Sequence, residues 1–136
     1  MNKLLASLTI ALCGLTTSTW VSANEFEDLR AEMSAARESL VTLVVNKEKR
    51  GADQQKLVKD TADKVSAHLA KTKAPAGKEA QFKELTETWT AFKKTRETEL
   101  VPAALAGKDD EAKRLTNGIQ KERITKIQQI LGDLGG

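Results

Sequence analysis

Arg96 is the residue whose place in the sequence most suggests chemistry, because it interrupts an apolar stripe. The stripe has the helical spacing of three and four residues and continues on both sides of the arginine: Phe82, Leu85, Trp89, Phe92 and Leu100. A buried guanidinium needs a partner, and an incoming carboxylate or phosphate would serve as well as Glu99. Arg96 is therefore a candidate residue for binding a small anion. The alternative is that its stem packs along the core edge while its guanidinium reaches water.

Two residues near the end of the sequence join Arg96 as candidates for ligand binding. Counting outward from the predicted turn between the last two helices places Arg96 beside Asn117 and Gly118. The same count sets Arg114 opposite Glu99. Glycine inside a helix costs roughly 1 kcal/mol relative to alanine. Gly118 therefore marks a local weak point, which is either a gap for a ligand, a close approach of helices or simply tolerated.

No set of residues has the spacing of a catalytic or metal site. Histidines and carboxylates form no cluster with metal-ligand spacing, and the single imidazole, His68, leaves serines and threonines without a plausible general base. The single cysteine, Cys13, lies in a segment that we expect to be removed. We therefore expect a protein that binds rather than catalyses, with no metal and no cofactor.

The first 23 residues have the order of a secretory signal peptide. Lys3 precedes an apolar run over residues 4–15, and residues 21–23 offer a small-x-small cleavage site. We place the cut after Ala23, which leaves residues 24–136 as a mature periplasmic domain. An uncleaved anchor would need roughly 20 consecutive apolar residues, which this run does not reach.

Lipoprotein processing at Cys13 is an alternative fate for this segment. It would require a small residue where Leu12 stands. Nothing after residue 23 resembles a membrane span, so we expect the mature chain to be soluble.

Size and charge narrow the class of protein further. The mature domain has 113 residues, which suffices for one domain with a single core. Without Lys3 it has 21 lysines and arginines against 19 acidic residues, a formal net charge of +2. This balance is unlike that of a nucleic-acid-binding protein.

Apolar residues recur at helical spacing in four segments, and no alternating strand pattern occurs. The segments cover residues 26–50, 53–72, 82–106 and 109–134. Because the linkers are short, we predict an all-α, antiparallel up-down-up-down four-helix bundle. Five basic residues gather near the first and third turns, as an anion-attracting cap or a solvated face: Lys47, Lys49, Arg50, Lys56 and Lys108.

Pro102 should disturb the third helix. It lacks the N–H that would bond to the carbonyl of Thr98. We therefore expect this helix to bend or end loosely near Val101, with residues 103–106 as a last turn before Gly107.

The stretch of residues 89–134 resembles the second helical hairpin of the four-helix-bundle sensor domains of methyl-accepting chemotaxis receptors. The resemblance is carried by an aromatic pair, a turn, one alanine and a long last helix: Trp89, Phe92, residues 105–109, Ala112 and residues 109–134. The first hairpin, residues 24–72, matches only in helix length and pattern. The resemblance implies a periplasmic bundle that often dimerises and that binds small molecules or a binding protein.

The sequence also departs from the receptor plan. It contains no second membrane helix and no cytoplasmic signalling helices, and it has no match for the arginines with which amino-acid receptors grip their ligand. No ligand residue carries over from the family. We expect a free-standing sensor-like protein that binds a small anion, with a second copy or a membrane receptor as its partner.

A second resemblance is to small periplasmic four-helix cytochromes. The Cys-x-x-Cys-His motif of covalent haem attachment is absent. Non-covalent ligation in that family pairs a methionine on the first helix with a histidine on the last. Here Met33 is present, but the only histidine, His68, lies on the second helix, so a Met33–His68 haem site is an alternative. Another alternative is a helical periplasmic chaperone or stress protein, which would expose apolar surface.

Overall fold

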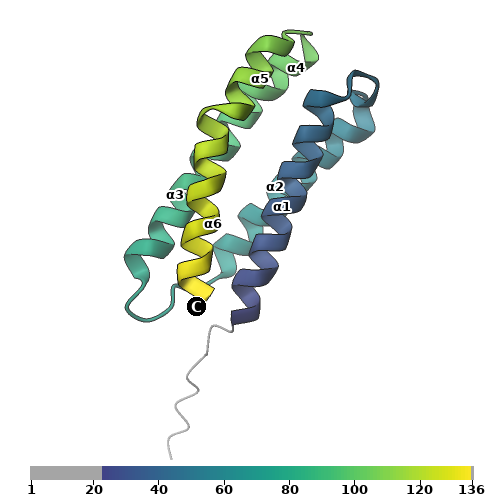
Figure 1. Cartoon of the computed structure of the whole chain (residues 1–136). Coiled ribbons are helices and arrows are strands. Elements are labelled where there is room, and N and C mark those ends of the chain that lie inside the picture. Colours follow the sequence, from purple (N-terminus) through teal and green to yellow (C-terminus); the bar gives the residue numbers. More distant parts are fainter. Residues whose placement is uncertain (1–22, 136) are drawn as a thin grey trace, which may run out of the picture.

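The computed structural model describes residues 23–135, and these residues contain helices and turns but no strand. They form four helical segments that lie alongside one another (Figure 1). The prediction of an all-α fold is confirmed. Except for Ala23, the predicted signal peptide with its Cys13 lies outside the described residues.

The first helix, α1, spans Ala23–Val45 and begins at the residue after which we predict cleavage. It is shorter than predicted, because Lys47–Lys49 form a separate 3₁₀ turn, η1. The side chain of Asn46 accepts a hydrogen bond from the backbone N–H of Glu48 at 3.1 Å. This contact caps η1 and so favours a new turn over continuation of α1.

The second helix, α2, spans Ala52–Lys71 and buries an apolar stripe at the predicted helical spacing, made of Val58, Ala62, Val65 and Leu69. Its N-cap is Gly51, and Asp53, where the predicted segment begins, lies within the first turn. An acidic residue there still complements the positive end of the helix dipole. The helix ends before the loop of residues 72–78.

The third segment changes its hydrogen-bond pattern in front of the proline. It comprises α3 (Glu79–Thr95), the π-helical turn η2 (Arg96–Leu100) and α4 (Val101–Leu105). The N–H of Val101 donates to the carbonyl of Arg96, five residues back. Pro102 has no N–H to offer the carbonyl of Thr98, and the wider turn lies where that bond is missing. The expected irregularity near Val101 is thus a π turn within a continuous segment.

The turn after α4 closes with a Schellman motif. The N–H of Lys108 donates to the carbonyl of Ala103 at 2.9 Å, and that of Gly107 to Ala104 at 3.2 Å. Gly107 has φ +74°, a left-handed conformation that glycine adopts without a side-chain clash. The turn therefore depends on this glycine.

The fourth segment is interrupted once. It comprises α5 (Asp109–Asn117) and α6 (Ile119–Gly135), with Gly118 between them. A Cβ atom at Gly118 would lie 2.9 Å from the carbonyl oxygen of Arg114. The weak point predicted at this glycine is a local distortion, since helical hydrogen bonds run to and from Gly118, and a side chain there would require the backbone to shift.

Gly118→Ala is expected to lower the free energy of unfolding by about 1 to 3 kcal/mol, because the backbone must shift to admit the methyl group. Urea denaturation would measure the change. Gly132→Ala is the matched control, since its Cβ would meet only the Arg30 side chain at 3.8 Å. That variant should be unchanged or slightly more stable. Equal effects of the two substitutions would contradict the close approach at Gly118.

The helices do not pack against one another equally. α1 packs along α2 and α6, and α3 packs along α6, whereas α2 and α3 approach each other at few positions. The turns of residues 46–51 and 106–108 lie at one end of the set of helices, and the loop of residues 72–78 lies at the other end (Figure 1). No helix within residues 23–135 is long and apolar enough to cross a bilayer.

Candidate functional site

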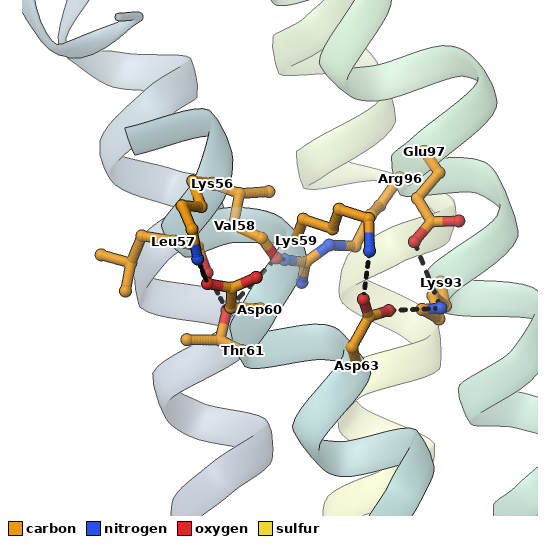
Figure 2. Close-up of polar contacts among 10 residues, drawn as sticks. All are labelled: Lys56, Leu57, Val58, Lys59, Asp60, Thr61, Asp63, Lys93, Arg96 and Glu97. Carbon is orange, nitrogen blue, oxygen red and sulfur yellow. Dashed lines mark hydrogen bonds and ion pairs between the residues drawn. The ribbon is translucent and has the colours of Figure 1, made fainter. Parts of the chain in front are cut away.

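Arg96 is fully buried at the junction of α3 and η2. One terminal nitrogen of its guanidinium donates to the carbonyl of Ala36 in α1 at 3.0 Å. The other donates to the carbonyl of Val58 in α2, as Figure 2 shows. The suggestion that this guanidinium reaches water is therefore wrong. Arg96 instead joins the third segment to the first and second helices.

The charge of Arg96 has no carboxylate partner within residues 23–135. Burial lowers the pKa of Arg96 to about 10, although the charges of Glu97 and Asp63 oppose this shift, so the group stays cationic at neutral pH. Asp63 instead accepts hydrogen bonds from Lys59 and from Lys93, the latter at 2.9 Å (Figure 2). These hydrogen bonds lower the pKa of Asp63, and the bond from Lys59 has the largest effect.

A groove between α2 and α3 lies over Arg96, with a volume of about 440 Å³. Its charged rim is already neutralised, because Lys93 pairs with Asp63 and also with Glu97 at 3.3 Å. The terminal nitrogens of Arg96 point to main-chain carbonyls in the bundle. The Nε of Arg96 is buried without a hydrogen-bond partner among the described residues, so it is the guanidinium nitrogen that the carbonyls leave free.

The three residues predicted to bind a ligand do not lie together. Arg96 lines the groove between α2 and α3, whereas Asn117 lines a separate cavity on the side of α1 and α6. Arg114 is exposed on α5 and lines neither hollow. Counting residues outward from the turn placed Arg96 and Asn117 at similar positions along the helix axes. The count could not show which side of α3 each residue lies on.

The cavity beside Asn117, which we call the Asn117 cavity, has a volume of about 380 Å³. Its walls come from α1, α3, η2, α5 and α6: Arg37, Leu40, Val41, Phe92, Leu100, Thr116, Asn117, Gln120, Lys121, Ile124, Thr125 and Gln128. Four of these residues are buried and apolar: Leu40, Phe92, Leu100 and Ile124. The cavity thus combines an apolar surface with amide and hydroxyl groups.

The two charged side chains that line the Asn117 cavity are both positive. Arg37 on α1 and Lys121 on α6 belong to its lining, and no lining residue is acidic. Neither cation forms an ion pair with any residue of the described part of the chain. Two unpaired cations across one cavity create a positive potential that attracts anions.

Gln120 is the buried polar residue of this cavity. Its amide nitrogen donates to the carbonyl of Phe92 at 2.9 Å, and its amide oxygen accepts from Arg123 at 2.9 Å. These bonds fix the amide between α3 and α6. Gln120 therefore provides a preorganised polar group in the wall. Sequence reasoning missed this role, because Gln120 looks like any solvated helix residue.

Met33 and His68, the alternative haem ligands, are engaged separately. His68 Nδ1 lies 2.9 Å from a carboxylate oxygen of Glu32, and its Nε2 lies 3.9 Å from Glu25. Met33 is buried on α1 and lines a small cavity beside Ile127 of α6. Within residues 23–135, no three His, Cys, Asp or Glu side chains are arranged to hold a metal ion.

Arg50 is the interaction centre that sequence analysis missed. Its guanidinium donates to the carbonyls of Leu43 at 2.9 Å, Val44 at 2.7 Å and Ala104 at 2.7 Å. It also donates to a carboxylate oxygen of Asp109 at 2.9 Å. Arg50 thus joins the ends of α1 and α4 to the start of α5 and is not free to attract an anion.

Asp109 should make folding sensitive to acid. Hydrogen bonds from Lys47 and then from Arg50 lower the pKa of Asp109 in the folded state. The stabilisation is therefore present above the unfolded pKa of about 4 and is lost as pH falls through the lower folded value. Asp109→Asn should lower the melting temperature at pH 7 and have a smaller effect at pH 3.

Circular dichroism melts at both pH values test this expectation. Asp110→Asn is the control, because Asp110 is exposed and forms no ion pair with the described residues. If Asp109→Asn lowered the melting temperature equally at pH 7 and pH 3, the ionised carboxylate would not be what stabilises the turn.

Comparison of the chain with models of protein families, with curated proteins and with solved structures finds no match.

Proposed function

We propose that this chain is an exported binding protein that holds a small anionic molecule in the Asn117 cavity. One observation carries the proposal: Arg37 and Lys121 line the cavity without acidic partners, and the lining contains no carboxylate. An anion there would gain two charged contacts without displacing an existing ion pair. A volume of about 380 Å³ suits a small ligand, since ligand pockets usually span about 300 to 1,000 Å³.

The cellular setting of this proposal comes from the sequence. The order of charges and apolar residues over residues 1–23 supports export and cleavage after Ala23. Short linkers support an antiparallel up-down-up-down order of the helices. The resemblance of residues 89–134 to chemoreceptor sensor domains supports a sensor-like role, in which a second copy or a membrane receptor detects the bound state. Catalysis is no part of this proposal.

Removing the two cations should weaken anion binding specifically. Arg37→Gln and Lys121→Gln each delete a charged hydrogen-bond donor, which is worth about 1.5 to 3 kcal/mol when the bond forms. We expect each variant to bind an anion about tenfold or more weakly than the natural chain. Acetate, benzoate, octanoate and inorganic phosphate are suitable probes, with affinity measured by isothermal titration calorimetry.

Lys94→Gln is the matched control for these variants. Lys94 is an exposed lysine of α3 outside the Asn117 cavity, so the substitution changes net charge equally. It should leave the affinity unchanged. If Lys94→Gln weakened binding as much as Lys121→Gln, the attraction would come from net charge rather than from this cavity.

A further inference from the structure

The Asn117 cavity continues along the seam between α1 and α6. A smaller cavity of about 80 Å³ adjoins it, lined by Arg30, Met33, Ser34, Arg37, Glu38, Ile124, Ile127, Gln128 and Leu131. Three residues line both hollows: Arg37, Ile124 and Gln128. The two hollows are therefore neighbours along α1 and α6, with the Arg37 side chain between them, and we call the pair the seam.

The far part of the seam has an apolar wall next to polar side chains from α1, which are Arg30, Ser34 and Glu38. Met33, Ile127 and Leu131 form this wall and are almost fully buried. From Ile124 to Leu131 the seam follows α6 for about 10 Å, at 1.5 Å per residue. Methionine and the long stem of Arg37 can both change rotamer, so this part can widen to admit a chain.

Arg30 marks the end of the seam. A Cβ atom at Gly132 of α6 would lie 3.8 Å from a guanidinium nitrogen of Arg30, so this α1 side chain reaches across to α6. Its partner Glu27 lies 3.9 Å away. The seam therefore has cations, Lys121 and Arg37, at the larger hollow, an apolar wall in the smaller hollow, and a far end crossed by Arg30.

We infer that the ligand is an elongated amphiphile with an anionic head and an unbranched apolar chain. The head lies between Arg37 and Lys121, and the chain runs past Ile124 toward Leu131. This inference rests on the proposed function and adds the chemical class of the ligand. A compact ion would use the two cations but would leave the apolar wall of the seam empty.

A series of straight-chain carboxylates tests the inference. Each methylene that leaves water is worth about 0.8 kcal/mol, which corresponds to about fourfold in affinity. Titration calorimetry with butanoate, hexanoate, octanoate and decanoate, below micelle-forming concentrations, should show this rise until the seam is filled. Octyl phosphate in parallel identifies which head group, carboxylate or phosphate, is preferred.

Ser34→Phe should shorten the usable seam. Ser34 is exposed and lines only the far hollow, so a phenyl ring there should fill that hollow without disturbing the core. Octanoate should then bind about tenfold more weakly, while butanoate should be unaffected. Ala35→Phe is the control, because Ala35 is an exposed neighbour on α1 that lines neither hollow.

The outcomes separate this inference from the proposed function. Equal affinity for all chain lengths, still dependent on Arg37 and Lys121, would overturn the amphiphile and leave anion binding intact. Octanol binding as tightly as octanoate would overturn the anionic head. Failure of every anion to bind would overturn both proposals.

Discussion

Arg50→Ala is expected to lower the free energy of unfolding by about 3 kcal/mol or more. Arg50 donates to the carbonyls of Leu43 and Val44, in the last turn of α1, and to Ala104 near the end of α4. The last carbonyls of a helix have no partner within that helix, and a positive charge there also favours the helix dipole. Alanine leaves these groups and the carboxylate of Asp109 without their donor. Guanidinium chloride denaturation would measure the loss.

Arg50→Lys separates charge from geometry. Lysine keeps the positive charge but cannot reproduce a planar fork that reaches four acceptors. We expect the free energy of unfolding of Arg50→Lys to lie between those of the natural chain and Arg50→Ala. Full stability of Arg50→Lys would show that charge alone suffices and that the fork contributes little.

Arg96→Ala is expected to cost about 2 to 5 kcal/mol, whereas Arg96→Met should cost far less or be neutral. Arg96 is fully buried, so alanine leaves a large cavity. Methionine fills most of that volume and removes a buried charge that has no carboxylate partner. The carbonyls of Ala36 and Val58 keep the helical N–H four residues later as a donor, and the hydroxyl of Ser39 also donates to Ala36.

Urea denaturation of both Arg96 variants, with titration of octanoate into Arg96→Met, tests this expectation. The affinity for octanoate should be unchanged, because the Asn117 cavity does not include Arg96. If Arg96→Met were as unstable as Arg96→Ala, the hydrogen bonds rather than the filled volume would hold the helices together. Loss of octanoate binding in Arg96→Met would show that Arg96 contributes to the binding site.

The spacing of apolar residues predicted the helices well, because a buried core requires apolar side chains along one face of each helix. The stripe of α2 is buried as expected, and Gly118 interrupts the last segment where a weak point was predicted. The end of α1 was missed, because a side-chain cap from Asn46 competes with helix continuation over residues that otherwise favour helix. Such a local competition leaves no trace in apolar periodicity.

The site was only partly predictable for a geometric reason. Asn117 was selected and does line the cavity, but Arg37 and Lys121 look like ordinary solvated cations in the sequence. Only the packing of α1 against α6 places both cations beside one cavity. Conversely, Arg96 was correctly marked as an anomaly in the stripe, yet its partners are main-chain carbonyls, which every residue possesses.

Native mass spectrometry of the protein produced from its full sequence, including the predicted signal peptide, tests anion binding in the Asn117 cavity most directly. We predict a chain that begins at Asn24 and retains an anionic small molecule, with the adduct lost from the Arg37→Gln/Lys121→Gln double variant and kept by Lys94→Gln. The chain mass reports cleavage independently of binding. A bare natural chain, or an adduct that the double variant retains equally, would contradict the proposed site.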